Sequence, residues 1–346
     1  VRQAFVEAAE KHGVGSGASH LVTGHGVEHE ALEEELAAFT GRDRALVFST
    51  GYMANLGVIG TLADQNGAVV ADKLNHASLI DGCRLSGSEV RRYRHGNASH
   101  ARELLAAITG ATRLLVTDGV FSMDGDVAPL RELAHAARAA RAWLIVDDAH
   151  GLGVLGGSGG GCCEQLALSA DDVPVLIGTF GKAFGTFGAF VAGDADLIEY
   201  LLQRSRTYIY TTALPPAVAA ATRAALRVSQ RESWRREKAL ALSRRFHQAL
   251  REEGIGVGIA AGGDSQPDTT GETTIVPVVV GEAAGALEMS RVLESRGFLV
   301  TAIRPPTVPQ GTARLRVTLS ASHEEAQVDA LVDAFAGALA ARAPVA

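Results

Sequence analysis

Short apolar runs rich in β-branched residues alternate with amphipathic helical stretches along the first two thirds of this chain. Such alternation favours an α/β fold in which a largely parallel sheet is covered by helices on both faces. The last two runs are joined by a glycine-rich loop that is too short for a helical crossover, so we expect this pair to be antiparallel. The seven predicted strands are residues 45–49, 68–72, 89–93, 113–117, 142–148, 174–180 and 188–192.

The pattern changes after "YIYTTALPP", and this change predicts the domain organisation. A long helical stretch, about 215–253, leads into the apolar runs "TTIVPVVV", "GFLVTAI" and "RLRVTLS", which are separated by further helical segments. We therefore predict a large domain over 45–225 and a small C-terminal α+β domain over 226–346. Residues 1–44 form a preceding segment of helix, glycine loop and helix, which we expect to be incomplete.

Charge and composition exclude several classes of protein. A formal net charge of −7 does not indicate a nucleic-acid or anionic-membrane surface. No apolar run is long enough to cross a bilayer, and no secretory pattern opens the chain. The three cysteines, Cys83, Cys162 and Cys163, have neither disulfide-framework nor metal-ligand spacing. We expect a cytoplasmic protein.

A single lysine stands in the stretch "LIGTFGKAFGTFG". Only four of the 32 basic residues are lysines, so few side chains can perform amine chemistry. Lys182 is the one among small and apolar neighbours, and we expect these neighbours to exclude water and favour the neutral, nucleophilic amine. The alternative is a lysine that extends from a loop to solvent.

Polar groups that would suit pyridoxal phosphate follow the ends of several predicted strands. Asp147 and His150 in "LIVDDAH" would place a carboxylate on a pyridinium nitrogen, although helix capping is an alternative. In "STGYMAN", Gly51 and Tyr52 open a helix whose N–H groups would bind a phosphate, although an ordinary strand–helix turn has the same pattern.

Three further residues would complete such a site. His76 in "DKLNHAS" would stack on the ring, unless it is only structural. The hydroxyls of Ser122 and Thr179 follow strand ends, where ligands of α/β proteins bind.

Other motifs carry less weight. "GLGVLG" matches a dinucleotide-binding glycine pattern, but a glycine loop rather than a helix follows it. "GTFGK" lacks the spacing and the hydroxyl of a phosphate-binding P-loop. "HGVEH" has two histidines, His25 and His29, without a third metal ligand, so we predict no metal site.

Taken together, these segments resemble the α-oxoamine synthases, which are fold-type I pyridoxal phosphate enzymes. The resemblance covers essentially the whole chain. Its branch-specific part, "AIRPPTVP", is similar to the branch that serves biotin synthesis. The segments that carry it are "GSGASHLVTGHGVEHEALEEELA", "STGYMANLGVI", "DKLNHASLIDG", "TDGVFSMDGDVAPL", "VDDAHGLGVLG", "TFGKAFGTFGAF", "YIYTTALPPA" and "TAIRPPTVPQGTARLRVTLSA".

The resemblance implies a role for each candidate residue. Lys182 would hold the cofactor as an aldimine and later move protons, with Asp147 on the ring nitrogen and His76 stacked on the ring. Thr212 would reach the cofactor phosphate of a neighbouring subunit, which implies a homodimer. The remaining roles are ring-hydroxyl contacts for His150 and Ser122, phosphate contacts for Gly51, Tyr52 and Thr179, and substrate contacts for Arg316, Arg304, Thr307 and Asn55.

The resemblance also implies a reaction. L-alanine would condense with pimeloyl-CoA, or with pimeloyl on acyl carrier protein, with loss of CO2 and thiol to give 8-amino-7-oxononanoate. The alternative is another branch, of the glycine C-acetyltransferase, 5-aminolevulinate synthase or serine palmitoyltransferase type. Members of the family carry a further upstream segment, with a stretch like "NDYLGL", which helps to build the substrate channel.

Overall fold

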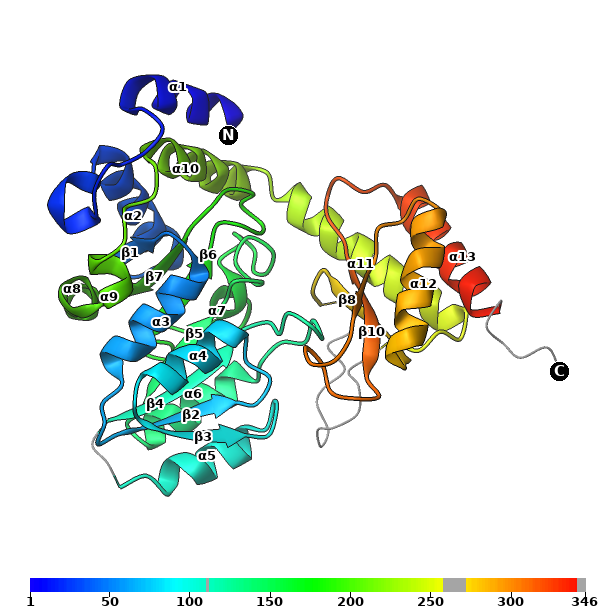
Figure 1. Ribbon diagram of the computed structural model, residues 1–346, viewed down its shortest axis with the longest axis horizontal. Coiled ribbons are helices and arrows are strands. Elements are labelled where there is room, and N and C mark those ends of the chain that lie inside the picture. Colours follow the sequence, from blue (N-terminus) through cyan, green and yellow to red (C-terminus); the bar gives the residue numbers. More distant parts are fainter. Residues whose placement is uncertain (110–111, 258–271, 341–346) are drawn as a thin grey trace. The chain divides into compact units, whose positions relative to one another are not determined.

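The computed structural model describes residues 1–109, 112–257 and 272–340. The chain forms two compact units (Figure 1). The first comprises Val1–Val120 and Ala128–Ser233, and the second comprises Phe121–Val127 and Trp234–Ala346. The sequence-based boundary at 225/226 falls inside helix α10 (Pro216–Arg231), whereas the units separate after that helix ends. Among the described residues, no helix has both the length and the apolar character needed to cross a membrane.

The first unit is built on a seven-stranded sheet in the order β1-β7-β6-β5-β4-β2-β3. β7 is antiparallel to both of its neighbours, and the other pairs are parallel, so the predicted mainly parallel sheet and the antiparallel hairpin are confirmed. The strands are β1 (Arg44–Phe48), β2 (Ala68–Asp72), β3 (Glu89–Tyr93), β4 (Arg113–Asp118), β5 (Trp143–Asp147), β6 (Val175–Thr179) and β7 (Ala189–Gly193).

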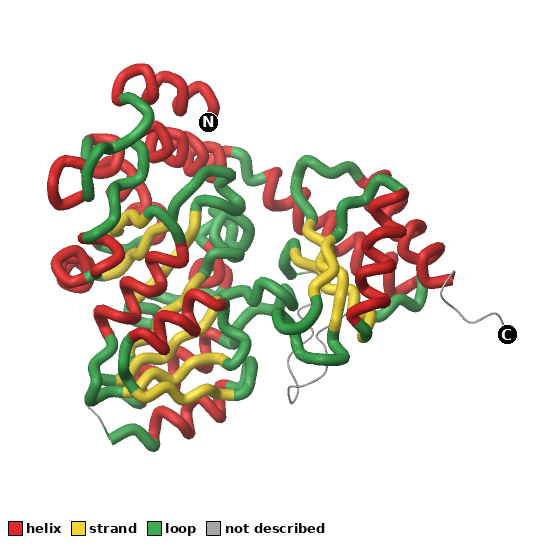
Figure 2. The backbone as a smooth tube through the Cα atoms, viewed as in Figure 1, coloured by secondary structure: helices red, strands yellow, loops and turns green. Residues whose placement is uncertain are grey.

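Helices cover both faces of this sheet because its strands are apolar on both faces (Figure 2). In β1, Leu46 and Phe48 pack into one hydrophobic cluster, and Ala45 and Val47 pack into another on the opposite face. The helices are α1 (Arg2–His12), α2 (Val27–Thr40), α3 (Gly51–Leu62), α4 (Ala77–Leu85), α5 (Ala98–Ala106), α6 (Leu130–Ala139), α7 (Gly161–Gln165), α8 (Ala195–Arg204), α9 (Arg206–Ile209) and α10, with a π-helix, η1 (His20–Gly24).

The second unit has its own core, and it confirms the predicted small α+β architecture. Its antiparallel sheet has the order β8-β10-β9, and helices pack against it around Phe246, Leu315 and Phe335. The helical stretch predicted over about 215–253 is two helices, α10 and α11, rather than one. The elements are α11 (Trp234–Glu252), β8 (Ile275–Gly281), α12 (Ala283–Ser295), β9 (Thr301–Ile303), β10 (Ala313–Thr318) and α13 (Glu325–Ala340).

Candidate active site

Three neighbouring strands of the first unit each end in a buried aspartate. Asp72, Asp118 and Asp147 are the last residues of β2, β4 and β5, and they are 1%, 4% and 6% exposed. Asp118 and Asp147 are register partners, so their side chains project to the same face of the sheet. Burial and the adjacent Asp147 raise the pKa of Asp118 well above its usual value, whereas the charge of Lys182 opposes this rise. A cation placed beside this pair of carboxyl groups would therefore be strongly stabilised.

Asp147 is oriented by two hydrogen bonds. The backbone N–H of Ala149 donates to Oδ1 at 3.0 Å, and Nδ2 of Asn55 donates to Oδ2 at 2.7 Å. Asn55 also donates to Oγ of Ser78 at 2.8 Å, while its own Oδ1 is buried without a hydrogen-bond partner among the described residues. The resemblance implied a substrate contact for Asn55. In the structure, Asn55 lies in α3 and contacts Asp147, the carboxylate that is expected to bind the ring nitrogen.

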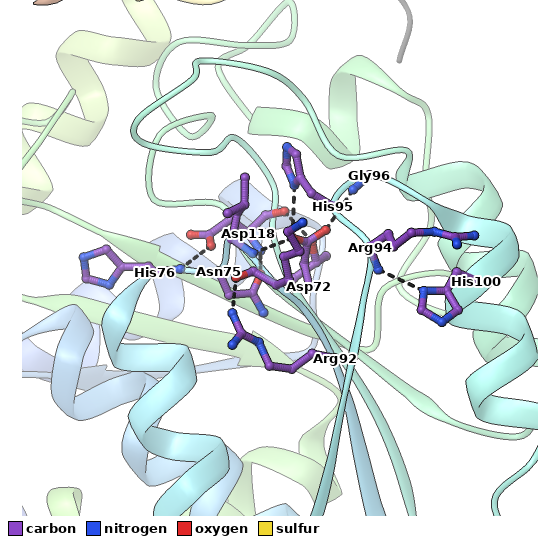
Figure 3. Close-up of polar contacts among 12 residues, drawn as sticks. Asp72, Asn75, His76, Arg92, Arg94, His95, Gly96, His100 and Asp118 are labelled. Carbon is purple, nitrogen blue, oxygen red and sulfur yellow. Dashed lines mark hydrogen bonds and ion pairs between the residues drawn. The ribbon is translucent and has the colours of Figure 1, made fainter. Parts of the chain in front are cut away.

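His76 is held through both its backbone and its ring. It is the N-cap of α4, and its backbone N–H donates to Oδ2 of Asp118 at 2.7 Å (Figure 3). Its Nδ1 lies 2.7 Å from Oγ and 3.3 Å from the backbone N of Ser78. Because a backbone N–H can only donate, Nδ1 is the acceptor and the neutral ring carries its proton on Nε2. The exposed imidazole is therefore fixed in direction as well as position.

The predicted phosphate residues come together at the start of α3. Thr50 caps this helix by accepting from the backbone N–H of Met53, so Gly51 and Tyr52 contribute N–H groups to its first turn. A Cβ on Gly51 would lie 4.0 Å from the Cβ atoms of Thr179 and Ala189, so the glycine leaves room beside Thr179. This helix N-terminus suits an anion. The phenol of Tyr52 is directed elsewhere and donates to Oδ2 of Asp81 at 2.5 Å.

Lys182 differs from the sequence-based expectation in one respect. It lies in the loop after β6, but it is exposed, so the expectation that its neighbours exclude water is wrong within this chain. The reason is that the loop folds back on itself at the sheet edge, and only Phe180 and Phe184 point into the core. Its loop nevertheless begins at the carboxyl end of β6, next to the end of β5 that carries Asp147, and the charge of Lys182 opposes the rise in the pKa of Asp118.

His150 lies on the turn that follows β5. The hydrogen bond from Ala149 to Asp147 starts this turn, and His150 is half-buried on it. The "GLGVLG" motif continues as turns up to α7, a helix of five residues. No longer helix follows the motif to receive a pyrophosphate, so the local structure does not support the dinucleotide interpretation.

Thr212 has a fixed backbone and an exposed side chain. It forms an isolated antiparallel bridge with Ser19, and its carbonyl accepts a hydrogen bond from Oγ of Ser49 at 3.2 Å. The Thr212 side chain is therefore exposed on a backbone that is held at two points.

The other predicted site residues belong to the second unit. Nε of Arg316 donates to the carbonyl of Ser122 at 2.5 Å, and Nη1 donates to Thr318 at 2.9 Å. The preceding arginine of "RLR", Arg314, is fully buried in an ion pair with Asp124. Burial lowers the pKa of Arg316, which forms no ion pair with any residue that the structure describes. The half-buried Arg316 is thus the better candidate to bind a substrate carboxylate.

Arg304 and Thr307 lie just after β9 and are exposed; the backbone N–H of Thr307 donates to the carbonyl of Arg304 at 3.1 Å. Nothing in the second unit fixes which substrate group they would meet, so their role stays a prediction.

The histidines of "HGVEH" pack into a cluster with His20. Nδ1 of His20 and Nδ1 of His25 are 2.9 Å apart, and Nε2 of His29 lies 2.6 Å from the carbonyl of Leu214. Burial, with the neighbouring histidines, lowers the pKa of His20 to about 3. Among the described residues, no group of histidine, cysteine or acidic side chains is arranged to hold a metal ion.

The cysteines fit a structural role. All three are free and buried, and burial raises the pKa of Cys83 and of Cys163 to about 12.

Sequence reasoning missed Asp118 and Ser78. Asp118 ends an apolar strand in "LLVTDG", just as Asp147 does in "LIVDD", and that repeated pattern was the available signal. No sequence pattern marks Ser78, because its contact with Asn55 forms only where α3 packs against α4.

Comparisons with known proteins agree with this geometry. The family model for class I and II aminotransferases matches residues 1–335. The 8-amino-7-oxononanoate synthase of Methylococcus capsulatus is 59% identical over 339 residues, covering 98% of this chain and 85% of the relative. That of Alkalilimnicola ehrlichii is 60% identical over 331 residues, covering 96% and 82%. The chain belongs to the class I and II aminotransferase family, in its 8-amino-7-oxononanoate synthase branch.

Solved structures of this family confirm the predicted fold class. Sphingomonas wittichii serine palmitoyltransferase matches with a TM-score of 0.92 and 34% identity, over 98% of this chain and 83% of the other. The 8-amino-7-oxononanoate synthase of Francisella tularensis matches with a TM-score of 0.82 and 30% identity, over 98% and 93%. A further serine palmitoyltransferase match, with a TM-score of 0.92, 35% identity and cover of 98% and 83%, carries a pyridoxal phosphate internal aldimine.

The side chains of the first unit fit pyridoxal phosphate. A buried carboxylate suits a pyridinium, a helix N-terminus suits the phosphate, and an amine suits the aldehyde. The buried, unpartnered Oδ1 of Asn55 beside Asp147 is a further sign that a polar group belongs at this edge.

Proposed function

We propose that this protein is a pyridoxal phosphate-dependent acyltransferase that condenses L-alanine with a pimeloyl thioester to give 8-amino-7-oxononanoate, CO2 and thiol. The observation that carries the proposal is the chain of hydrogen bonds from Asp147 through Asn55 and Ser78 to His76. Lys182 lies on the loop that begins at the carboxyl end of β6, the strand next to β5. Relatives of that name at 55–60% identity support the assignment of the reaction.

When bound, the cofactor supplies an electron sink for the negative charge that develops at the amino-acid Cα. The chain's own groups bind and orient it. The Asp147 carboxylate would keep the ring nitrogen protonated, and the two hydrogen bonds to this carboxylate fix its direction. The N–H groups of Gly51 and Tyr52, with the Thr179 hydroxyl, would hold the phosphate. His76 would cover the ring face.

Lys182 has the two tasks that suit an amine near buried carboxyl groups. Its Nζ would first bind the cofactor aldehyde, and after its release it would take and return the proton at the substrate Cα. The flanking Gly181 and Gly185 offer little steric hindrance to this movement.

The resemblance assigns the substrate contacts to residues of the second unit. The planar guanidinium of Arg316 would bind the alanine carboxylate through two parallel hydrogen bonds. Arg304 and Thr307 would line the acyl-substrate side, and Ser122 would approach the ring hydroxyl together with His150. The thioester carrier would be CoA or acyl carrier protein.

The test is a spectrum of the purified protein incubated with pyridoxal phosphate and then desalted. We expect the wild type to retain a visible absorption band that L-alanine shifts, and we expect Lys182→Ala to retain none because the amine is missing. Lys238→Ala is the matched control, since this lysine pairs with Glu324 in the second unit. A wild type that stays colourless would refute the cofactor assignment.

The substrate assignment is tested separately, because serine palmitoyltransferases share the fold with high TM-scores. Steady-state rates are compared for alanine, glycine and serine with pimeloyl-, acetyl- and palmitoyl-CoA. A preference for any pair other than alanine and pimeloyl-CoA would overturn this substrate choice.

The assembly that fits the exposed Thr212 is a homodimer in which each protomer contributes this hydroxyl to the other's phosphate site. The cytoplasmic location expected from the sequence stays a prediction.

A further inference from the structure

Asp118 has no part in the function proposed above, although it is buried next to Asp147. Its carboxyl group accepts the backbone N–H of His76, and its own backbone N–H donates to Oδ1 of Asn75 at 3.1 Å. Nδ2 of Asn75 in turn donates to the carbonyl of Val116 at 2.9 Å. Figure 3 shows these contacts joining the end of β4 to the loop that carries His76. Three hydrogen bonds therefore tie this loop to a single strand end.

The other end of the same loop is fixed by Asp72. Its Oδ1 accepts the backbone N–H of Leu74 at 2.8 Å, and its Oδ2 accepts that of Gly96 at 2.9 Å. Nδ1 of His95 lies 3.0 Å from the same carboxylate (Figure 3). The four residues from Lys73 to His76 are thus held between two buried carboxyl groups of adjacent strands.

Stability alone does not account for an acid at position 118. The charged groups that act on it include two acids, Asp72 and Asp147, and one cation, Lys182. A buried carboxyl group next to other acids destabilises the folded state, and an apolar residue at this strand end would usually destabilise it less. The carboxyl group does provide one thing that an apolar side chain cannot, namely an acceptor for the N–H of His76.

We propose that Asp118 is a positioning residue that sets the place of the His76 imidazole by accepting its backbone N–H. This inference rests on the proposed function for its consequence, since His76 is there the residue that covers the cofactor ring. Asp118 fixes the main chain of His76, and Ser78 fixes the direction of its ring. Without Asp118, the ring of His76 would keep its contact with Ser78, but the backbone of His76 would lose its hydrogen bond to the end of β4.

The first experiment measures the position of His76 without the cofactor. Amide hydrogen exchange at His76 is followed by mass spectrometry in the apoprotein for wild type, Asp118→Ala and Asp118→Asn. We expect exchange about tenfold faster in Asp118→Ala, because a hydrogen bond to a buried carboxyl group is lost. Asp118→Asn keeps an oxygen acceptor and should fall between the two, at about threefold.

Asp194→Ala is the matched control. This aspartate also accepts a backbone N–H at the start of a helix, from Leu197 at 2.8 Å, but it follows β7 at the opposite edge of the sheet. It should leave His76 exchange unchanged. Unchanged exchange at His76 in Asp118→Ala would overturn the proposal. If Asp118→Ala does not fold, unchanged exchange in Asp118→Asn overturns it instead.

The second experiment separates positioning from a general loss of structure. In the holoenzyme, Asp118→Ala is expected to weaken pyridoxal phosphate binding about tenfold and to lower kcat more than it raises KM for alanine. Asp118→Asn should recover most of both. A fall in thermal stability with unchanged cofactor affinity and unchanged kcat would show a purely structural role and overturn the proposal. A wild type that binds no cofactor would refute the proposed function, while the exchange result would still decide the role of Asp118.

Discussion

At the scale of single residues, Glu33 shows how strongly burial can alter an acid. Its Oε1 accepts the backbone N–H of Val47 at 2.8 Å, and its Oε2 lies 3.9 Å from Nε2 of His25. Burial raises the pKa of Glu33 to about 8, against the opposing effects of the Val47 hydrogen bond and of Arg44. The carboxyl group is therefore protonated at neutral pH, beside histidines that are themselves neutral.

We predict that Glu33 makes the protein less stable as the pH rises. The folded state holds this proton more tightly than the unfolded state does, so the contribution is complete below pH 4.5 and is lost as the pH rises to about 8. His20 has the opposite effect, but only between about pH 3 and 6.5. Between pH 6.5 and 8 we expect the contribution of Glu33 to the unfolding free energy to fall by up to ~1.4 kcal/mol per pH unit.

The measurement is urea unfolding of wild type and Glu33→Gln across this pH range. The glutamine variant should show a flatter pH dependence. Burial also raises the pKa of Asp148, to about 7, so Asp148 lowers stability in the same direction as the pH rises. Because both proteins contain Asp148, the difference between their pH dependences reports the contribution of Glu33 alone. Identical slopes for both proteins would contradict this assignment.

At the scale of elements, the glycine-rich stretch around Lys182 has a packing role that the sequence did not reveal. A Cβ on Gly178 in β6 would overlap the side chain of Leu152 and lie 2.5 Å from the Phe190 ring. Gly188 has φ +111° where the chain turns into β7. These glycines therefore let a strand and a turn pack tightly, and the two aromatic rings of Phe180 and Phe190 stack beside them.

Gly178→Ala is expected to destabilise the protein by about 1–3 kcal/mol, because the added methyl group overfills a packed core. Gly60→Ala is the matched control, since this glycine is exposed in α3 and a Cβ there meets nothing within 4 Å. It should stabilise the helix by roughly 0.5–1 kcal/mol. The midpoints of chemical unfolding provide the comparison, and equal midpoints for both variants would refute this account of Gly178.

At the scale of the whole molecule, the proposed dimer makes a quantitative prediction. Thr212 lies on a fixed backbone with its side chain exposed, and Lys182 belongs to the protomer's own sheet edge. If each site uses Lys182 of one protomer and Thr212 of the other, then two different defective protomers can form one intact site between them.

Co-expression of Lys182→Ala and Thr212→Val chains should therefore restore activity that neither variant has alone at low cofactor concentration. Random assembly makes half of the dimers mixed, each with one intact site of two, so about a quarter of the wild-type activity is expected. A chain that carries both substitutions, co-expressed with Lys182→Ala, is the control and should restore none. Absence of recovery in the first mixture would contradict the sharing of Thr212.

The sequence predicted the strands well because their signal is local. Six of the seven strands are short runs rich in Val, Ile, Leu or Ala, and β3, "EVRRY", is the exception. The observed bounds differ from the predicted ones by at most one residue at either end. The break between α10 and α11 was missed because neither glycine nor proline marks it in the sequence.

The predictions of site residues rest mainly on positions at the ends of strands. Asp147, His76 and Gly51 each follow an apolar run, and parallel strands gather such positions at one edge. The exposure of Lys182 was not predictable, because apolar neighbours in sequence point to different sides of a loop in space.

By itself the sequence determined the α/β class, the antiparallel hairpin around Lys182 and the chemistry of the groups at the strand ends. These follow from local periodicity and from residue type, which need no knowledge of distant contacts. Only the tertiary structure decided that Asn55 and Ser78 link Asp147 to His76, and that Asp118 anchors the same histidine. The physical reason is that these hydrogen bonds join α3, α4, β4 and β5, whose approach is set by sheet order and helix packing rather than by any local pattern.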